Sequence, residues 1–384
     1  MSATTRKYFR KKRTFLLAAV FYLLIALEFF YMASPFALYF YSVYGPGLRF
    51  INEHPTLAWL ASVFLPHIVV ESSSILLDLR NVIGGVLGLF GFLAFCLGAG
   101  QVYYHKLARK GAVTGGIYNI IRHPQYASLA ICGFGLLLLW PRYIVLLSFI
   151  TMLFAYYFLA KIEERECVEQ FGQSYAKYKA RTNMFLPFRL PIIDKLPSLP
   201  RAGVQRYLPV LAVYIVTCIA AIALANGLRS WSVNNLYTLY TENAVYLSVS
   251  KTDPNTLKQI IDIALSNPDV SGRLKSEKEY NDWKFINYIM PAGWYVSEIP
   301  MNPVEGTRGG HVHPARYDRT LYKIIFTRAE LRAGQAAEGK DILMNTKRRW
   351  PVVEVAVDLS RERVSRITNP PTKTKYENIP VPVF

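Results

Sequence analysis

Residues 126–164 read YASLAICGFGLLLLWPRYIVLLSFITMLFAYYFLAKIEE, and this stretch decides the fold. Two apolar runs, 126–140 and 143–160, are separated only by Pro141 and Arg142. A membrane-spanning helix needs about 20 apolar residues, so each run is long enough to form most of a span. The short break between them predicts a helical hairpin, in which the chain enters the membrane and returns to the same side.

The hairpin would bring residues from before and after it to one membrane face. Arg122 and His123 precede the first run, and Glu163 and Glu164 follow the second. Ionisable groups at a membrane boundary are costly to dehydrate, so they usually pair or serve a site. This set suits a zwitterionic ligand, because the cations attract its carboxylate and the carboxylates attract its ammonium.

Each of these residues also has an ordinary structural explanation. Arg122 has the position of a basic flank, and Pro124 is a normal first residue of a helix. The two carboxylates could pair locally with Lys161 or Arg165. Glycines near the end of a span are typical of close helix packing. The order and spacing of the whole set, rather than any one residue, favour a site.

The ordered set resembles the isoprenylcysteine carboxyl methyltransferase family and the related phospholipid N-methyltransferases. Those membrane enzymes share Gly-x-Tyr, Arg-His-Pro-x-Tyr, a hairpin, Glu-Glu, then Phe-Gly-x-x-Tyr-x-x-Tyr and a proline. The matching positions are Gly116 (or Gly115), Tyr118, Arg122, His123, Pro124, Tyr126, Glu163, Glu164, Phe171, Gly172, Tyr175, Tyr178 and Pro187. The phospholipid enzymes also carry an upstream Gly-x-Gly, which Gly98 and Gly100 resemble. One departure is Ser128, where the family often has glycine; the larger residue would narrow a lipid or cofactor passage.

The resemblance implies S-adenosylmethionine as the cofactor and a lipophilic methyl acceptor, either a prenyl-cysteine carboxylate or a lipid amine. It implies catalytic positions at Arg122, His123 and Tyr126. The cofactor contacts that it implies are Gly98, Gly100, Gly116, Tyr118, His123, Pro124, Glu163 and Glu164. Methyl transfer is an in-line displacement, which needs alignment and a dry pocket more than acid–base groups.

Two other functions stay open at this stage. The chain could be a non-catalytic membrane subunit of a larger complex, built on a methyltransferase-like scaffold and held by its long C-terminal part. It could also be a sterol-type reductase, since those membrane enzymes carry a similar Arg-His-Pro-x-Tyr and use NADPH. The adjacent Glu163 and Glu164 argue against the reductase.

The predicted architecture is an α-helical membrane bundle of five to six spans, followed by an extramembrane α+β domain. Besides the hairpin, apolar runs occur at 14–34, 57–77, 82–100 and 208–225. The predicted division is a basic segment at 1–13, a methyltransferase-like membrane domain at 14–206, a helix and linker at 207–229, and the extramembrane domain at 230–384. The run at 57–77 contains proline, histidine, glutamate and serines, so it is the weakest span and could be tilted or interfacial.

The C-terminal part has the pattern of a folded domain. Residues 240–250, 321–327 and 352–360 are rich in β-branched and aromatic residues and predict strands. The run from Asp253 predicts a helix, with that aspartate as N-cap and proline at the first helical position. The Pro-rich residues 367–384 predict an extended end.

The charge is +18, and the excess is concentrated in residues 1–225, between the apolar runs. That pattern predicts cytoplasmic loops facing anionic lipids rather than nucleic acid binding. The motif face is therefore expected in the cytoplasm and the C-terminal domain on the opposite side. Three full spans before residue 101 would conflict with this topology, so either one early segment does not cross fully or the first apolar run crosses twice. Membrane lipids, the acceptor and a protein bound through 230–384 are the expected partners.

Cysteine and histidine usage predicts no metal site. None of the four cysteines has CxxC spacing, so neither zinc nor a disulfide framework is indicated. His311 and His313 could be two ligands, but no clear third accompanies them.

Overall fold

A computed structural model of the chain describes residues 37–108, 113–188, 208–277, 283–304, 310–332 and 338–371. The apolar run at 14–34, the basic segment before it and most of the predicted extended C-terminus lie outside these residues. The chain forms two compact units that interleave along the sequence. The helical unit comprises Met1–Tyr44, Ile83–Leu139 and Met152–Arg201, and the sheet unit comprises Gly45–Val82, Trp140–Thr151 and Ala202–Phe384.

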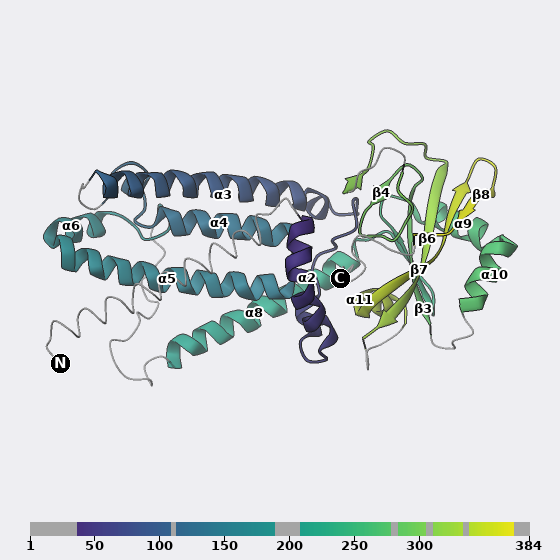
Figure 1. Cartoon of the computed structure of the whole chain (residues 1–384), viewed down its shortest axis with the longest axis horizontal. Coiled ribbons are helices and arrows are strands. Elements are labelled where there is room, and N and C mark those ends of the chain that lie inside the picture. Colours follow the sequence, from purple (N-terminus) through teal and green to yellow (C-terminus); the bar gives the residue numbers. More distant parts are fainter. Residues whose placement is uncertain are drawn as a thin grey trace. The chain divides into compact units, whose positions relative to one another are not determined.

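The helical unit is built on parts of three long helices that lie side by side (Figure 1). They are α3 (Ile75–Leu107), α4 (Pro124–Leu139) and α5 (Tyr143–Phe171). The predicted hairpin is confirmed, because only residues 140–142 separate α4 from α5. The 3-10 turn η2 (Gly116–Asn119) precedes the hairpin, and α6 (Gln173–Arg181) follows it.

Glycines let α3 and α4 approach each other backbone to backbone. A Cβ atom built on Gly91 would lie 2.4 Å from the Cys132 nitrogen, and one built on Gly135 would lie 2.4 Å from the Gly88 nitrogen. No larger residue fits there unless the helices separate. Ser128 belongs to this contact, since its carbonyl oxygen is 2.7 Å from the same Gly91 position. It therefore packs between two helices.

Three helices in the described part of the chain are long and apolar enough to cross a membrane. Their candidate spans are Ile75–Val102, Tyr143–Phe171 and Leu208–Val233, and α4 is a shorter apolar helix. Five to six spans are therefore not confirmed within these residues. The predicted run at 82–100 is the middle of the longer α3, and the run at 208–225 is the first part of α8 (Leu208–Val233).

The prediction of a span at 57–77 is wrong. Only Ala58–Ala61 forms a 3-10 turn, η1, and residues 62–74 contain no helix. The physical reason is that this backbone bonds to other parts of the sheet unit instead of to itself. The Val70 and Glu71 amides both donate to the Val249 carbonyl, at 3.0 and 3.1 Å. The backbone amides of this segment thus find their hydrogen-bond partners in another part of the chain, whereas a membrane-spanning helix needs them for its own internal hydrogen bonds.

The same segment holds the hairpin turn. The Phe64 amide donates to the Pro141 carbonyl at 2.8 Å, and the Arg142 guanidinium donates to the Ala61 carbonyl at 2.6 Å. Val63 and Arg142 form an isolated β-bridge. Arg142 is thus a buried structural cation that closes the turn, and not an exposed basic residue at the end of a span. A preceding helix, α2 (Ala37–Glu53), contributes Glu53, whose carboxylate pairs with Arg348 at 2.6 Å.

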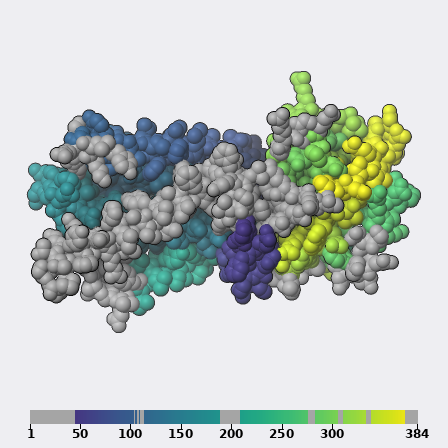
Figure 2. Space-filling view, viewed as in Figure 1, coloured from purple at the N-terminus to yellow at the C-terminus, as the bar shows by residue number. Residues whose placement is uncertain are grey.

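The sheet unit contains a mixed six-stranded sheet in the order β1-β2-β3-β6-β7-β8. Its strands are β1 (Thr238–Tyr240), β2 (Ala244–Ser248), β3 (Lys284–Pro291), β6 (Leu321–Leu331), β7 (Thr346–Asp358) and β8 (Arg363–Thr368). The strands expected at 240–250, 321–327 and 352–360 are confirmed. The outer strand β8, yellow in Figure 2, lies at the surface. The short strands β4 (Tyr295–Val296) and β5 (His311–Val312) form a separate pair.

Helices cover both faces of this sheet (Figure 1). One face packs against α9 (Pro254–Ser266) and α10 (Pro268–Glu277), which form the crossover between the parallel strands β2 and β3. The other packs against α11 (Lys340–Asn345) and the end of α8. The N-cap prediction for α9 is confirmed, because the Asp253 side chain accepts the Asn255 and Thr256 amides. The C-terminal part is therefore a folded α+β structure, with one apolar core on each face of its sheet.

Candidate functional site

The residues that flank the hairpin meet at one end of α4 and α5. The Arg122 guanidinium donates to a Glu164 oxygen at 2.6 Å, although the two residues are 42 positions apart. His123 lies between the two carboxylates, with Nδ1 3.5 Å from Glu163 and Nε2 3.4 Å from Glu164. The convergence predicted from the hairpin alone is confirmed.

A second segment closes over this cluster from the chain that follows α6. Ile121 and Asn183 form a parallel β-bridge. The Arg122 amide donates to the Asn183 carbonyl at 2.8 Å, and the His123 amide donates to the Met184 carbonyl at 3.0 Å. These backbone bonds fix the direction in which the arginine and histidine side chains leave the chain. Gly172 makes the sharp turn from α5 into α6, with φ at +58°, where a side chain would be strained.

Glu164 is the buried centre of the network. Its side chain is 1% exposed, and the Lys179 ammonium lies 2.8 Å from its second oxygen. Three positively charged or protonatable groups therefore surround one carboxylate, two from the start of the hairpin and one from α6. A buried charge is tolerated only when it is paired in this way.

Arg122 makes several contacts within the protein itself. Besides Glu164, its guanidinium donates to the Lys179 carbonyl at 2.9 Å and to the Thr182 carbonyl. Those carbonyls belong to the last turn and the C-cap of α6, which a cation stabilises. Arg122 thus connects the start of α4, the end of α5 and the end of α6.

Glu163 is placed differently from its neighbour. Its side chain is 42% exposed, and one oxygen accepts the Tyr126 hydroxyl at 2.6 Å. The Tyr126 ring stacks on the rings of His123 and Tyr156, with centroids 5.8 and 5.0 Å away. The Glu163 carboxylate is therefore accessible to solvent or a ligand. Its position is fixed by the hydroxyl of Tyr126, whose ring is stacked on neighbouring aromatic side chains.

The two carboxylates favour the protonated form of His123. Burial by itself would lower the pKa of His123, but Glu163 and Glu164 outweigh it and raise the pKa above its ordinary value of 6.5. A protonated imidazole with both nitrogens directed at carboxylates is an ion-pair partner and not a base.

This arrangement predicts a pH dependence of stability. Because the pKa of His123 is higher in the folded chain, its stabilisation is complete below pH 6.5 and is lost as the pH rises through the raised value. We expect the melting temperature of the wild type to fall more steeply than that of His123→Asn between neutral and alkaline pH. Melting curves of the two proteins in matched buffers measure this, and parallel curves would rule out the linkage.

The predicted glycine and tyrosine positions lie along α3 and η2. The Tyr118 hydroxyl points to the Gly98 carbonyl at 3.4 Å, and the Tyr178 hydroxyl donates to the Tyr118 carbonyl at 2.6 Å. A Cβ on Gly98 would lie 3.3 Å from Gln125, and one on Gly116 would lie 2.2 Å from the Gln101 amide. Gly100, by contrast, has nothing within 4 Å of its Cβ position. Gly98, Gly116 and Tyr118 are thus brought together, and Gly100 is not part of that contact.

Lys179 and Thr182 belong to the network but carry no role in the sequence interpretation. The motif Phe-Gly-x-x-Tyr-x-x-Tyr drew attention to Tyr175 and Tyr178, both of which are buried. Lys179 directly follows Tyr178 in a stretch with several basic residues. Nothing in the sequence distinguishes it from the other basic residues there. Only the fold shows that its ammonium meets Glu164.

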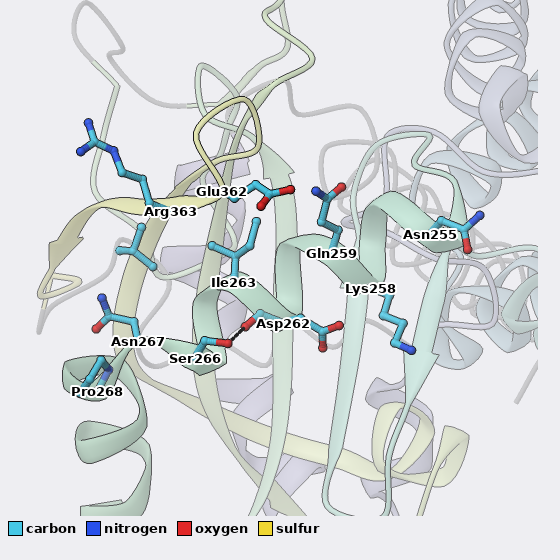
Figure 3. A pocket seen from close by; sticks show the side chains of 11 residues that line it. Asn255, Lys258, Gln259, Asp262, Ile263, Ser266, Asn267, Pro268, Glu362 and Arg363 are labelled. Carbon is cyan, nitrogen blue, oxygen red and sulfur yellow. Dashed lines mark hydrogen bonds between the residues drawn. The ribbon is translucent and has the colours of Figure 1, made fainter.

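The sheet unit offers an open groove of about 720 Å³ between α9, the start of α10 and the turn into β8 (Figure 3). Among the residues that line it are Lys258, Asp262, Asn267, Glu362, Arg363 and Val364. Figure 3 shows these charged side chains spread along the groove. The groove contains no convergent group of the kind found around Glu164.

A separate polar cluster lies beside β5. His311 Nε2 is 2.6 Å from a Glu298 oxygen, and His67 Nε2 is 3.8 Å from the other oxygen. Burial lowers the pKa of His67 to about 4. Within the described residues, no three His, Cys, Asp or Glu side chains are arranged to hold a metal ion. His313 contacts Trp294, with ring centroids 5.7 Å apart.

The comparisons with known proteins address the hairpin region. Residues 84–174 match the phospholipid methyltransferase family, which is about a quarter of the chain. The match spans α4, α5, most of α3 and the start of α6. No curated protein and no solved structure matches the chain.

Proposed function

We propose, from the match of residues 84–174 to the phospholipid methyltransferase family, that the chain is an S-adenosylmethionine-dependent methyltransferase with a lipophilic acceptor. The apolar helices and the family support an integral membrane protein. The observation that carries the proposal is the pair of adjacent carboxylates with opposite surroundings. Glu164 is neutralised by the chain, while Glu163 remains partly exposed beside it.

The residues present fit the cofactor. S-adenosylmethionine, when bound, supplies an electrophilic methyl group on a sulfonium and carries an ammonium group. Glu163 is the carboxylate that can take the ammonium, because its side chain is 42% exposed and Tyr126 fixes one of its oxygens. Gly98 and Gly116 make room near Tyr118 for the side chains of Gln125 and Gln101, which lie against their Cβ positions.

The chain's own groups act mainly by orientation. Arg122, His123 and Lys179 hold Glu164, and through it they fix α6 against the start of α4. That closes one side of the site and excludes water from it. Displacement at a methyl group depends on the alignment of the two reactants and on the exclusion of water. Holding the reactants in the right geometry can lower the activation barrier by about 7 kcal/mol or more. Arg122 and His123 would therefore be positioning residues.

The sidedness of the site is part of the proposal. Basic residues surround the motif at Lys161, Arg165, Lys177, Lys179 and Arg181. Such an excess supports a cytoplasmic motif face, with residues 230–384 on the opposite side of the membrane.

A methyl-transfer assay tests this function. The full chain in lipid nanodiscs is given S-adenosylmethionine labelled in its methyl group, and the lipids are extracted and separated. We expect label in a lipid fraction that is absent from the Glu164→Gln protein. Label recovered only as unreacted cofactor, in nanodiscs that contain both amine lipids and prenylated cysteine, would contradict catalysis.

One observation favours a second function. All the cations around Glu164 come from the chain itself, as they would in a membrane subunit whose site has become structural. In that case residues 230–384 would bind a protein partner. A measurement of cofactor binding distinguishes the two functions, because a methyltransferase would bind S-adenosylhomocysteine and a purely structural site would not.

A further inference from the structure

Four arginines lie where the apolar helices α3, α5 and α8 meet the rest of the sheet unit. Arg80 is near the start of α3, Arg142 is in the hairpin turn, Arg229 is near the end of α8, and Arg332 follows β6. Arg80 and Arg142 are buried, whereas Arg229 and Arg332 are partly exposed. The hairpin turn follows the last residue of α4 and the motif precedes the first, so this group is separate from the candidate cofactor site.

Three of these arginines donate to one segment, which begins in η1 and leads to α3. The Arg142 guanidinium donates to the Ala61 carbonyl at 2.6 Å. The Arg332 guanidinium donates to the adjacent Ser62 hydroxyl at the same distance. Arg80 donates to a carbonyl four residues further on, also at 2.6 Å. These contacts gather three positive charges around a few residues of the chain.

Arg229 joins this group from α8 through the end of α11. Its guanidinium donates to the Met344 carbonyl at 2.7 Å. The backbone amide of Arg332 donates to the carbonyl of the next residue, Asn345, at 3.0 Å. The two arginines are therefore neighbours, and their like charges repel each other. Burial, and then the positive charge of Arg229, lowers the pKa of Arg332 to about 10.

Arg332 has no anion among its partners in the described residues. Its side chain makes one hydrogen bond there, to the Ser62 hydroxyl, and its Nε–H donor has no partner. A guanidinium is always charged, and its N–H groups can only donate. A charge that is partly removed from water and placed beside a like charge is destabilising unless an anion pairs with it. The arrangement therefore fits an anionic ligand with several oxygen acceptors.

The position of the two arginines in the fold identifies the anion. The helix α8 is apolar and long enough to span a membrane, and Arg229 lies four residues before its last residue. That places the pair at the level of the lipid headgroups. Phosphate groups lie at this level, and their oxygens match the fork of guanidinium N–H groups. Basic pockets between transmembrane helices bind headgroups of this kind.

We infer that Arg229 and Arg332 bind the phosphate of an anionic phospholipid at the end of α8. The buried Arg80 and Arg142 add positive charge, which favours a headgroup with a net negative charge over a zwitterionic one. The lipid is a structural ligand and not the methyl acceptor, so the inference does not depend on the proposed methyltransferase function. Its phosphate neutralises the two neighbouring arginines and thereby stabilises the contacts among α8, α11 and the segment around Ser62.

The lipid dependence of stability tests this site in the full-length protein. The protein is delipidated in a neutral detergent, and its melting temperature is measured at one ionic strength with phosphatidylglycerol, phosphatidylcholine or inorganic phosphate. We expect saturating phosphatidylglycerol to raise the melting temperature by about 5 °C, and the other two to raise it much less. An equal rise with phosphatidylcholine would overturn the preference for an anionic lipid. An equal rise with inorganic phosphate would show that the ligand is a free anion and not a lipid.

A variant of Arg332 separates lipid binding from a purely structural contact. Arg332→Gln keeps a donor for the Ser62 hydroxyl but removes the charge, so the rise with phosphatidylglycerol should be lost. Without lipid, the same variant should melt at or above the wild-type temperature, because one of two like charges is gone. Arg348→Gln is the matched control. Arg348 is an exposed arginine of β7 that pairs with Glu53, and its variant should keep the full rise.

The opposite result has a clear form. If Arg332→Gln melted below the wild type by the same amount with and without phosphatidylglycerol, Arg332 would be a structural residue and the inference would be wrong. Native mass spectrometry adds a measurement that needs no delipidation. Protein released from nanodiscs with equal amounts of phosphatidylglycerol and phosphatidylcholine should retain the anionic lipid preferentially, and Arg332→Gln should lose that preference. Equal retention of both lipids by the wild type would also contradict the inference.

Discussion

Glu164→Gln should abolish S-adenosylhomocysteine binding and destabilise the helical unit by about 3 kcal/mol, at the lower end of the cost of breaking a buried ion pair. The substitution keeps the shape of the side chain but leaves Arg122, His123 and Lys179 without their common anion. The end of α6 should then separate from the start of α4. Thermal unfolding of the protein in detergent, with calorimetric titration of the ligand, measures both effects.

The neighbouring carboxylate is the matched control. Glu163→Gln removes the same charge one position earlier, at a side chain that is 42% exposed. We expect a change in stability below about 1 kcal/mol, as for exposed ion pairs, but ligand affinity reduced about tenfold or more. If both variants lost stability equally, or if Glu164→Gln bound ligand normally, the division of roles between the two glutamates would be wrong.

Gly91→Ala should destabilise the helical unit by about 3 kcal/mol, the upper end of the usual cost of overpacking. The added methyl group would lie 2.4 Å from the Cys132 nitrogen and 2.7 Å from the Ser128 carbonyl oxygen. Both are backbone atoms of α4, which cannot move aside as a flexible side chain does. The helices have to separate, and that loosens the hairpin. Melting temperature and protease resistance in detergent measure the effect.

Gly85→Ala is the control for that prediction. It lies on the same helix, six positions earlier, and its Cβ position has nothing within 4 Å. Alanine has the higher helix propensity, so stability should stay unchanged or rise slightly. Equal losses in Gly85→Ala and Gly91→Ala would show that the close crossing of α3 and α4 is not what limits stability.

The hairpin could be predicted from the sequence because it depends on local information. Two apolar runs and a Pro-Arg break leave one arrangement, and that arrangement brings Arg122 to Glu164. The strands and the Asp253 cap followed from local pattern for the same reason. The pairing order of the sheet, including the parallel pair β2 and β3, depends on contacts far apart in the chain, which local pattern does not determine.

Two features could not be predicted because tertiary contacts decide them. The run at 57–77 is apolar enough to resemble a span, but its amides bond to Val249, which lies about 180 positions later. The roles within the motif also depend on geometry. Glu163 and Glu164 are equivalent in the sequence, and only the approach of α6, with Lys179 and the carbonyl of Thr182, makes one structural and the other accessible.

The central claim is that the cluster around the hairpin is a cofactor site, and ligand-induced stabilisation of the purified full-length protein tests it most directly. S-adenosylhomocysteine at 100 times its dissociation constant should raise the free energy of unfolding by about 2.7 kcal/mol, and NADPH at the same concentration should not. Glu163→Gln should reduce the response, while Gly85→Ala should keep it. An unchanged melting temperature with S-adenosylhomocysteine and with S-adenosylmethionine would contradict the account.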